Sequence, residues 1–230
     1  MSDEKYFNFP IQLLDGFMSN PDKSLYNISK YVVYKNSLKL EFGTPLGKFK
    51  DSGDFYNLTF SNPPNALKEA EDMYLNIPEK APNTGLNLSI FWDFLRNDKT
   101  EFDKICLLAF LGIKSILGNK SYCKVTNLYL WSRMDGKTNT IVEVSELSNE
   151  VRKYANRYQS ENIKNELILN WHLIYYSRYT RGFYVSLKMS LEDLIFEAEK
   201  KRKSIKENQQ KLLQKVALKK ALERLKTTTN

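Results

Sequence analysis

The chain has 230 residues, 42% hydrophobic and 13% aromatic, so it can form a buried core and is not disordered throughout. The longest apolar run, residues 105–113, is too short to cross a bilayer, and the first residues lack the basic and apolar regions of a signal peptide. Cys106 and Cys123 do not form a Cys-x-x-Cys motif, and the apolar neighbours of Cys106 indicate a buried thiol. We therefore expect a reducing, cytoplasmic setting and no membrane partner.

Positive charge is concentrated near the C-terminus. Residues 199–226 contain eleven Lys and Arg and three Glu, a net charge of +8, while the rest of the chain has 24 residues of each sign. The protein is therefore a neutral body with a basic tail. Such a tail attracts phosphates without regard to sequence.

Residues 1–80 are predicted to form a mainly helical region. Its expected elements are helices over 7–18 and 23–40, a glycine- and proline-rich loop over 43–65, and a short helix over 65–75 with Asn65 as N-cap. Pro78 and Pro82 then predict a linker over residues 77–84, because proline fits neither a helix interior nor a strand ladder. The linker separates this region, a candidate protein-binding module, from a domain over 85–189.

The next domain is predicted to be organised around a helix over residues 101–117. Apolar residues surround most of its circumference, which is typical of a central core helix. Thr100 followed by Asp103 matches a capping box, and Gly118 follows the last turn. Further elements are expected in the order helix 124–134, short strand or inserted loop 138–144, and helix 145–156.

The stretch from 160 to 189 changes its hydrophobic period. Ser160 as a cap, with Ile163, Leu167 and Trp171 at spacings of four, predicts a helix over 160–173. An alternating pattern follows at Ile174, Tyr176, Phe183, Val185 and Leu187 and predicts a β-hairpin. Its tip, Arg178-Tyr179-Thr180-Arg181-Gly182, is cationic and provides a glycine for a positive φ.

A helix followed by a basic-tipped hairpin resembles the recognition helix and wing of winged-helix DNA-binding domains. The segment LGNKSYCKVTNLYLWSRMDG, with this helix and YTRGFYVSLK, is similar to small replication initiators and replisome organisers of plasmids and phages. The resemblance covers residues 100–189, and the extra segment 136–156 departs from the compact form, so that 145–156 is an alternative second helix of the motif. The resemblance implies a non-enzymatic protein that binds double-stranded DNA. The first setting that it implies is replication of a mobile element, and the second is transcriptional regulation.

The expected fold class is α+β: mainly α with a small β-hairpin. A winged-helix-like domain is preceded by a small helical region and followed by a long basic C-terminal helix over 190–230. The candidate DNA-binding residues lie on the recognition helix, on the hairpin tip and on the tail. They are Asn162, Lys164 and Asn165; Arg178, Tyr179 and Arg181; and Lys200, Lys201, Arg202 and Lys203.

No pattern of an active site is found. His172 is the single histidine and has no cysteine, histidine or carboxylate cluster near it in the sequence, so we expect neither a metal nor a Ser-His-Asp triad. Residues 43–48 lack the spacing of a phosphate-binding Walker loop. Asp51 and Asp54 are expected to be solvated turn residues. We therefore expect no catalysis and no cofactor.

The C-terminal helix is predicted over residues 191–225, with Ser190 as its cap. Arg202 and Gln209 interrupt its apolar stripe, which argues against a stable coiled coil. An alternative function stays open at this point: a protein-interaction adaptor whose body docks a partner and whose C-terminal helix mediates assembly. A homodimer also stays open.

Overall fold

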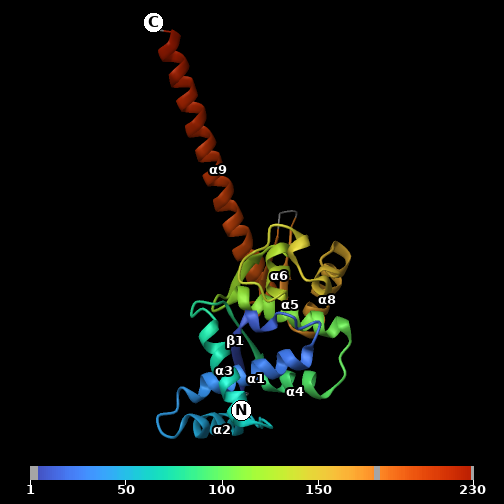
Figure 1. Ribbon diagram of the computed structural model, residues 1–230. Coiled ribbons are helices and arrows are strands. Elements are labelled where there is room, and N and C mark those ends of the chain that lie inside the picture. The colour runs from blue at the N-terminus through green and yellow to red at the C-terminus, as the bar shows by residue number, and fades with distance from the viewer. Residues whose placement is uncertain (1–4, 179–181, 229–230) are drawn as a thin grey trace.

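The computed structural model describes residues 5–178 and 182–228, with side chains up to residue 218. The protein is mainly helical with two small antiparallel sheets, which confirms the predicted mixture of helices and a small amount of β structure (Figure 1). Its N-terminal elements are β1 (Tyr6–Pro10), the 3-10 helix η1 (Ile11–Leu14), α1 (Pro21–Ser37), α2 (Pro45–Phe55), α3 (Pro63–Asn76), β2 (Asn83–Asn87) and α4 (Leu88–Arg96).

Two predicted elements of the N-terminal region were wrong. The expected helix over 7–18 is instead strand β1 followed by η1, because Phe7 and Phe9 alternate into the core while β1 pairs with β2. The expected loop over 43–65 contains α2. Its N-cap Thr44 accepts a hydrogen bond from the amide of Gly47, and proline occupies the first helical position.

The helices predicted over 23–40 and 65–75 are present as α1 and α3. The cap of α3 is Asn62, whose side chain accepts from the amide of Asn65, so Asn65 itself lies inside the helix. Residues 77–82 form the connection expected of the linker, but Asn83 and Thr84 already belong to β2. The core residues form one cluster from Phe7 to Val185, on both sides of this connection.

Helix α5 (Glu101–Leu117) is the central core helix, as predicted. Thr100 and Asp103 form the expected capping box: the Thr100 hydroxyl accepts from the Asp103 amide at 3.1 Å, and the Asp103 carboxylate accepts from the Thr100 amide at 3.0 Å. Gly112 allows close packing against α6 (Asn127–Met134), because a Cβ there would lie 3.2 Å from Cβ of Arg133.

The segment between α5 and the hairpin differs from the prediction in two ways. The helix expected over 124–134 is strand β3 (Tyr122–Val125) followed by α6, whose cap is Thr126. Of the two alternatives for 138–144, the loop is present over residues 138–143. The helix expected over 145–156 is reduced to the 3-10 helix η2 (Val144–Glu146) and one turn, α7 (Asn149–Arg152).

The predicted helix over 160–173 is present as α8 (Arg157–Asn170). Its cap is Asn156, which accepts from the Gln159 amide at 2.9 Å, whereas Ser160 is buried in the first turns of the helix. The hairpin of β4 (Ile174–Tyr176) and β5 (Phe183–Ser186) is confirmed, with Gly182 at φ 102°. β3 joins it to give a three-stranded sheet in the order β3-β5-β4.

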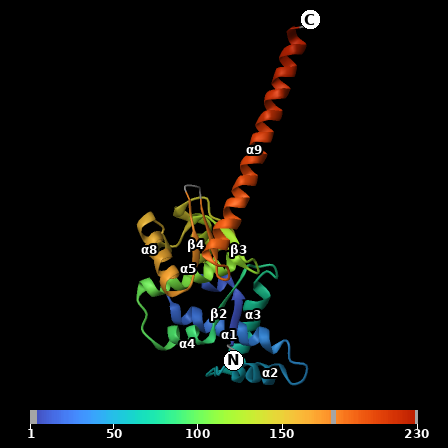
Figure 2. The same cartoon turned by 180° about the vertical axis from the view of Figure 1, so that it is seen from behind.

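The C-terminal helix α9 (Leu191–Thr228) begins on this sheet and then extends away from the body (Figures 1 and 2). Ser190 is its cap, as predicted, and accepts from the Asp193 amide at 3.1 Å. Leu194 and Ala198 are buried, so the first turns of α9 are docked. In the part of the chain that the structure describes, no helix combines the length and apolar character needed to cross a membrane.

Candidate nucleic-acid interface

Helix α8 has one buried and one exposed face. Ile163 and Leu167 are buried in the core, as their spacing predicted. Asn165 is exposed and Asn162 is half-buried, and with the exposed Tyr158 they lie on the opposite side of the helix. The two predicted asparagines therefore share an accessible face, where amide groups can both donate and accept hydrogen bonds.

Lys164 lies on the buried face of α8, where only 4% of the residue is exposed. Its ammonium nitrogen lies 2.9 Å from Oε1 of Glu161 and 4.7 Å from the ring centroid of Phe183. This contact with the aromatic core directs the charge towards the sheet. The sequence already indicates this burial, because Lys164 precedes Leu167 by three positions and therefore lies on the same face of the helix.

Each carboxylate of α8 has a neighbouring donor. Glu161 is paired with Lys164, and Glu166 accepts a hydrogen bond of 2.8 Å from the side-chain amide of Asn170. Neutralisation of Glu161 by Lys164 reduces the repulsion that the α8 face would exert on a phosphate.

Arg178 follows β4 and is exposed, with its guanidinium 3.9 Å from Oε1 of Glu199 on α9. The other two residues predicted at the hairpin tip, Tyr179 and Arg181, lie outside the described residues. Of the predicted set, the structure brings Arg178 and Arg202 together, because both approach the same carboxylate.

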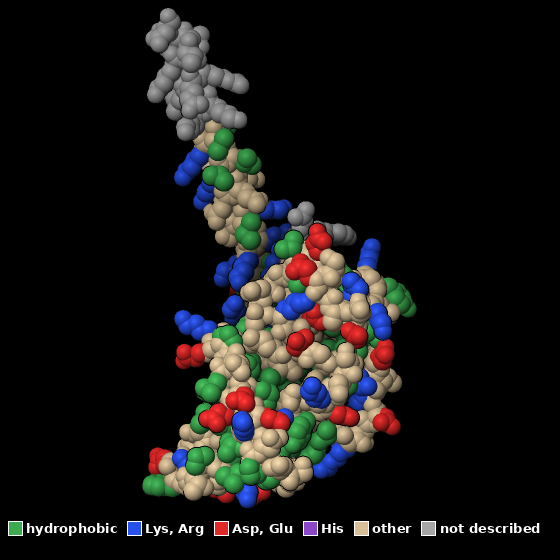
Figure 3. Space-filling view, viewed as in Figure 1, with side chains coloured by type: hydrophobic (Ala, Val, Ile, Leu, Met, Phe, Trp, Pro, Cys, Tyr) green, Lys and Arg blue, Asp and Glu red, His purple; other side chains and the backbone are tan. Residues whose placement is uncertain are grey.

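The four predicted cations of α9 occupy successive positions of the helix, directly after Glu199 and the buried Ala198. Lys200 lies 4.0 Å from Glu197, and the Lys201 ammonium lies 4.5 Å from the ring centroid of Tyr122. Arg202 lies 3.5 Å from Glu199, and Lys203 is exposed. Figure 3 shows Lys and Arg side chains along the described part of α9, whereas the body mixes both signs of charge.

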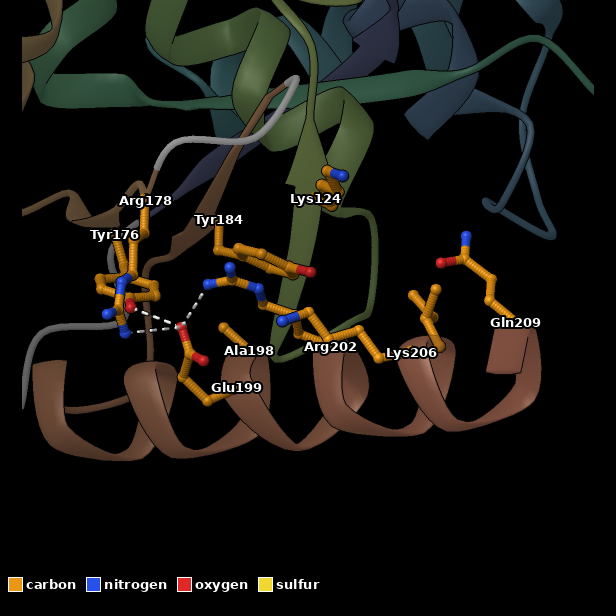
Figure 4. A pocket seen from close by; sticks show the side chains of 10 residues that line it. Lys124, Tyr176, Arg178, Tyr184, Ala198, Glu199, Arg202, Lys206 and Gln209 are labelled. Carbon is orange, nitrogen blue, oxygen red and sulfur yellow. Dashed lines mark hydrogen bonds and ion pairs between the residues drawn. The ribbon is translucent and has the colours of Figure 1, made fainter. Parts of the chain in front are cut away.

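A cavity of about 260 Å³ lies between the outer face of the three-stranded sheet and α9. We call it the sheet–helix cleft (Figure 4). Its sheet side is a cross-strand row, since Lys124 pairs with Tyr184 and Tyr184 pairs with Tyr176. Its helix side is formed by Ala198, Glu199, Arg202, Ile205, Lys206 and Gln209, and Arg178 closes one end.

Sequence reasoning did not identify Lys124, Tyr184 or Lys206 as site residues. Lys124 was expected in a helix, and its row with Tyr184 exists only because β3 pairs with β5 some 60 residues later. Lys206 belongs to the recognised basic segment, and one helical turn separates it from Arg202. The basic segment of the sequence could therefore have identified Lys206 as a site residue. Lys124 and Tyr184 could be identified only once the pairing of β3 with β5 was known.

Four lining residues of the cleft are cationic and one is acidic. The acidic one, Glu199, accepts a 2.7 Å hydrogen bond from the Tyr176 hydroxyl. This bond lowers the pKa of Glu199, with smaller contributions from Arg202 and Arg178, and it raises the pKa of Tyr176. The carboxylate is thus held ionised among donors, and the cleft keeps an excess of positive charge.

Within the described residues, no three His, Cys, Asp or Glu side chains gather as metal ligands do. His172 is exposed and has a φ of 55° at the end of α8. Cys106 is buried and Cys123 is half-buried, and burial raises the pKa of these thiols to about 12 and about 11. Neither thiol therefore has the lowered pKa of a reactive cysteine.

Comparisons with protein-family models, with curated proteins and with solved structures found no match to this chain. What the interface binds is therefore inferred from its geometry and charge.

Proposed function

We propose that this protein binds double-stranded DNA without catalysing a reaction, in the manner of a winged-helix domain. In this proposal α8 enters the major groove, the hairpin β4–β5 lies beside it, and α9 follows the phosphate backbone. The observation that carries the proposal is the arrangement of α5, β3, α6, α8, β4 and β5. Along the chain they come in the order helix, strand, helix, helix and hairpin, with η2 and the single turn α7 between α6 and α8, and β3 is paired with β5.

The exposed face of α8 supports a groove-reading role. Asn162 and Asn165 present amides, which pair with the N6 and N7 edge of adenine in the major groove. Lys164 is left out of the proposed interface, because its ammonium is enclosed by Glu161 and Phe183.

Charge supports contact with the backbone. Arg178 at the hairpin and Lys200, Lys203 and Lys206 on α9 are exposed cations on neighbouring elements. A protein that neutralises several phosphates releases counterions, so its affinity falls steeply with salt concentration. We infer replication initiation or organisation for a mobile element as the biological setting, on the resemblance of residues 100–189 alone.

Fluorescence anisotropy with a random duplex of about two helical turns tests the proposal at several salt concentrations. We expect Arg178→Ala to weaken binding and to reduce the slope of log K against log salt by about 1, since one phosphate contact is lost. Arg96→Ala is the matched control, because Arg96 is an exposed arginine on α4 that stacks on Trp92. Equal slopes for the two variants would contradict the backbone contact.

A second test addresses α8. Selection from a random duplex library gives a preferred sequence if α8 reads bases. Loss of that preference in the variant Asn162→Ala with Asn165→Ala, while general affinity stays, supports a groove-reading helix. Unchanged preference in this variant would rule out α8 as the reading element.

A second candidate function, a protein-interaction adaptor that assembles through α9, is favoured by exposed apolar residues beyond the body. Leu212 is 63% and Val216 is 45% exposed, and helical spacing places them on the same face as the buried Leu194 and Ala198. Analytical ultracentrifugation of nucleic-acid-free protein tests this candidate. The adaptor is favoured if the protein associates with increasing concentration and the double variant Leu212→Ser with Val216→Ser does not. A protein that stays monomeric at all concentrations would contradict assembly through α9.

A further inference from the structure

We propose that the sheet–helix cleft binds one nucleotide unit of single-stranded nucleic acid, with the base against Tyr184 and the phosphate among Lys124, Arg202 and Lys206. The inference deepens the proposed DNA-binding function, on which it rests, by adding a single-stranded ligand at a surface distinct from the exposed face of α8.

The size of the cleft selects a single strand. About 260 Å³ is slightly below the range of roughly 300–1,000 Å³ that encloses drug-sized ligands. A single base with its sugar and phosphate fits this scale, whereas a duplex would have to lie across the opening. The close view shows the cleft bounded by the sheet on one side and by successive turns of α9 on the other (Figure 4).

The floor of the cleft is suited to a base. Tyr184 and Tyr176 stand next to each other on the outer face of the sheet, and Ala198 and Ile205 add apolar surface from α9. Aromatic side chains on an open sheet face stack with unpaired bases, and every base has a flat face to offer. The Gln209 amide, at the far end of the cleft, can both donate to and accept from a base edge.

The rim of the cleft is suited to a phosphate. Lys124 projects from β3, and Arg202 and Lys206 project from consecutive turns of α9, so cations lie on both sides. Glu199 is ionised and offsets only part of this charge, because it is the one carboxylate beside four cationic lining residues. An anion that enters the cleft therefore meets an excess of positive charge, with Lys124 and Lys206 unpaired with Glu199.

The test uses the full chain and a fluorescein-labelled oligothymidylate of about fifteen nucleotides, with a duplex of equal length in parallel. Tyr184→Ala should weaken binding of the single strand roughly fivefold or more, the effect of removing one stacked base. Tyr184→Phe keeps the ring and should bind within about twofold of the unaltered protein, while Tyr184→Ala should leave duplex affinity within about twofold.

Two lysine variants on α9 give a second test that does not require a substitution in the sheet. Lys206→Ala and Lys211→Ala each remove one exposed α9 cation, but the two positions differ by about 140° around the helix and only Lys206 lines the cleft. Lys206→Ala should weaken single-strand binding more than Lys211→Ala. Equal effects of the two variants would reduce α9 to a general electrostatic attractor and overturn the proposed site.

Photo-cross-linking locates the bound strand directly. Oligonucleotides that carry 5-iododeoxyuridine should cross-link to Tyr184 or Tyr176, identified by mass spectrometry of the peptides. Cross-links confined to α8, or unchanged single-strand affinity in both Tyr184→Ala and Lys206→Ala, would overturn the proposal. Competition by thymidine monophosphate as effective, per nucleotide, as the oligonucleotide would identify a free nucleotide as the ligand and also overturn it.

The two proposals fail in different ways. Duplex binding that depends on Arg178 and α8, without Tyr184-dependent binding of a single strand, leaves the proposed function standing and removes this inference. Single-strand binding that depends on Tyr184, without duplex binding, leaves this inference standing and removes the proposed function.

Discussion

The hydroxyl of Tyr176 donates a 2.7 Å hydrogen bond to Oε1 of Glu199, and this bond joins strand β4 to helix α9 (Figure 4). The same carboxylate lies 3.5 Å from Arg202 and 3.9 Å from Arg178. Glu199 therefore fixes the first turns of α9 against the hairpin, and with them the width of the sheet–helix cleft.

Tyr176→Phe removes the donor of this bond and keeps the ring. We expect faster amide hydrogen exchange over residues 194–202, because the start of α9 opens more often, and unchanged exchange in α5. Tyr158→Phe is the control, since Tyr158 is an exposed tyrosine on α8. Exchange in α9 that does not differ between the two variants would show that the other contacts of α9 hold the helix, among them the buried Leu194 and Ala198 and the hydrogen bond from Tyr122 to Glu197.

Docking of α9 should weaken in acid. The hydrogen bond from Tyr176 is the main cause of the lowered pKa of Glu199. Since the folded pKa lies below the ordinary value of 4.5, the contact stabilises the folded state above that pH, and its contribution is lost as the pH falls through the folded pKa. Amide NMR shifts of residues 194–202 should follow this titration, and Glu199→Gln should abolish it. A titration that persists in Glu199→Gln would assign it to another group.

Lys164 and Asn165 are adjacent in sequence and should behave oppositely. Lys164→Ala should lower the free energy of unfolding by about 1–2 kcal/mol, because it removes a buried stem and the contact with Phe183. Asn165→Ala should change stability by less than about 0.5 kcal/mol but weaken binding to a selected duplex roughly fivefold or more. Urea unfolding and anisotropy measure the two effects, and a stability loss from Asn165→Ala alone would reverse the assigned faces of α8.

Gly182 should be more sensitive to substitution than Gly118. An alanine Cβ at Gly182 would lie 2.5 Å from the carbonyl oxygen of Val125, at a φ of 102°, so Gly182→Ala should cost about 2 kcal/mol or more. Gly118 has a φ of 52° and a ψ of −124°, with nothing within 4 Å of the added Cβ, so Gly118→Ala should cost only its backbone strain, about 1–2 kcal/mol. Thermal unfolding of the two variants measures both losses of stability. Equal losses would mean that the Val125 carbonyl of β3 does not lie against Gly182.

The two thiols should resist alkylation in the folded protein at pH 8. Burial raises the pKa of Cys106 to about 12 and of Cys123 to about 11, and the thiolate is the reactive form. Iodoacetamide should label both cysteines slowly under native conditions and rapidly in urea. Rapid native labelling of Cys123, the less buried of the two, would indicate opening of the sheet edge at β3.

Features that depend on close neighbours in the chain were predictable from the sequence. Helix α5 was predicted with its capping box between Thr100 and Asp103, and Ser190 was identified as the cap of α9. The hairpin β4–β5 followed from the change of hydrophobic period and from Gly182. Helix caps, helical stripes and short hairpins use contacts within a few residues, so their signals are local.

Only the tertiary structure decided which short apolar segments became strands. The sequence pattern of residues 7–18 predicts a helix, but β1 forms because β2 provides a pairing strand almost 80 residues later in the chain. In the same way, β3 forms because β5 provides its pairing strand. The same long-range pairing places Lys124 beside Tyr184 and turns Lys164 towards Phe183. Strand pairing and side-chain burial are fixed by residues distant in sequence, which a local pattern does not contain. The sequence therefore determined the basic helix and the hairpin, and the fold decided that together they enclose a cleft.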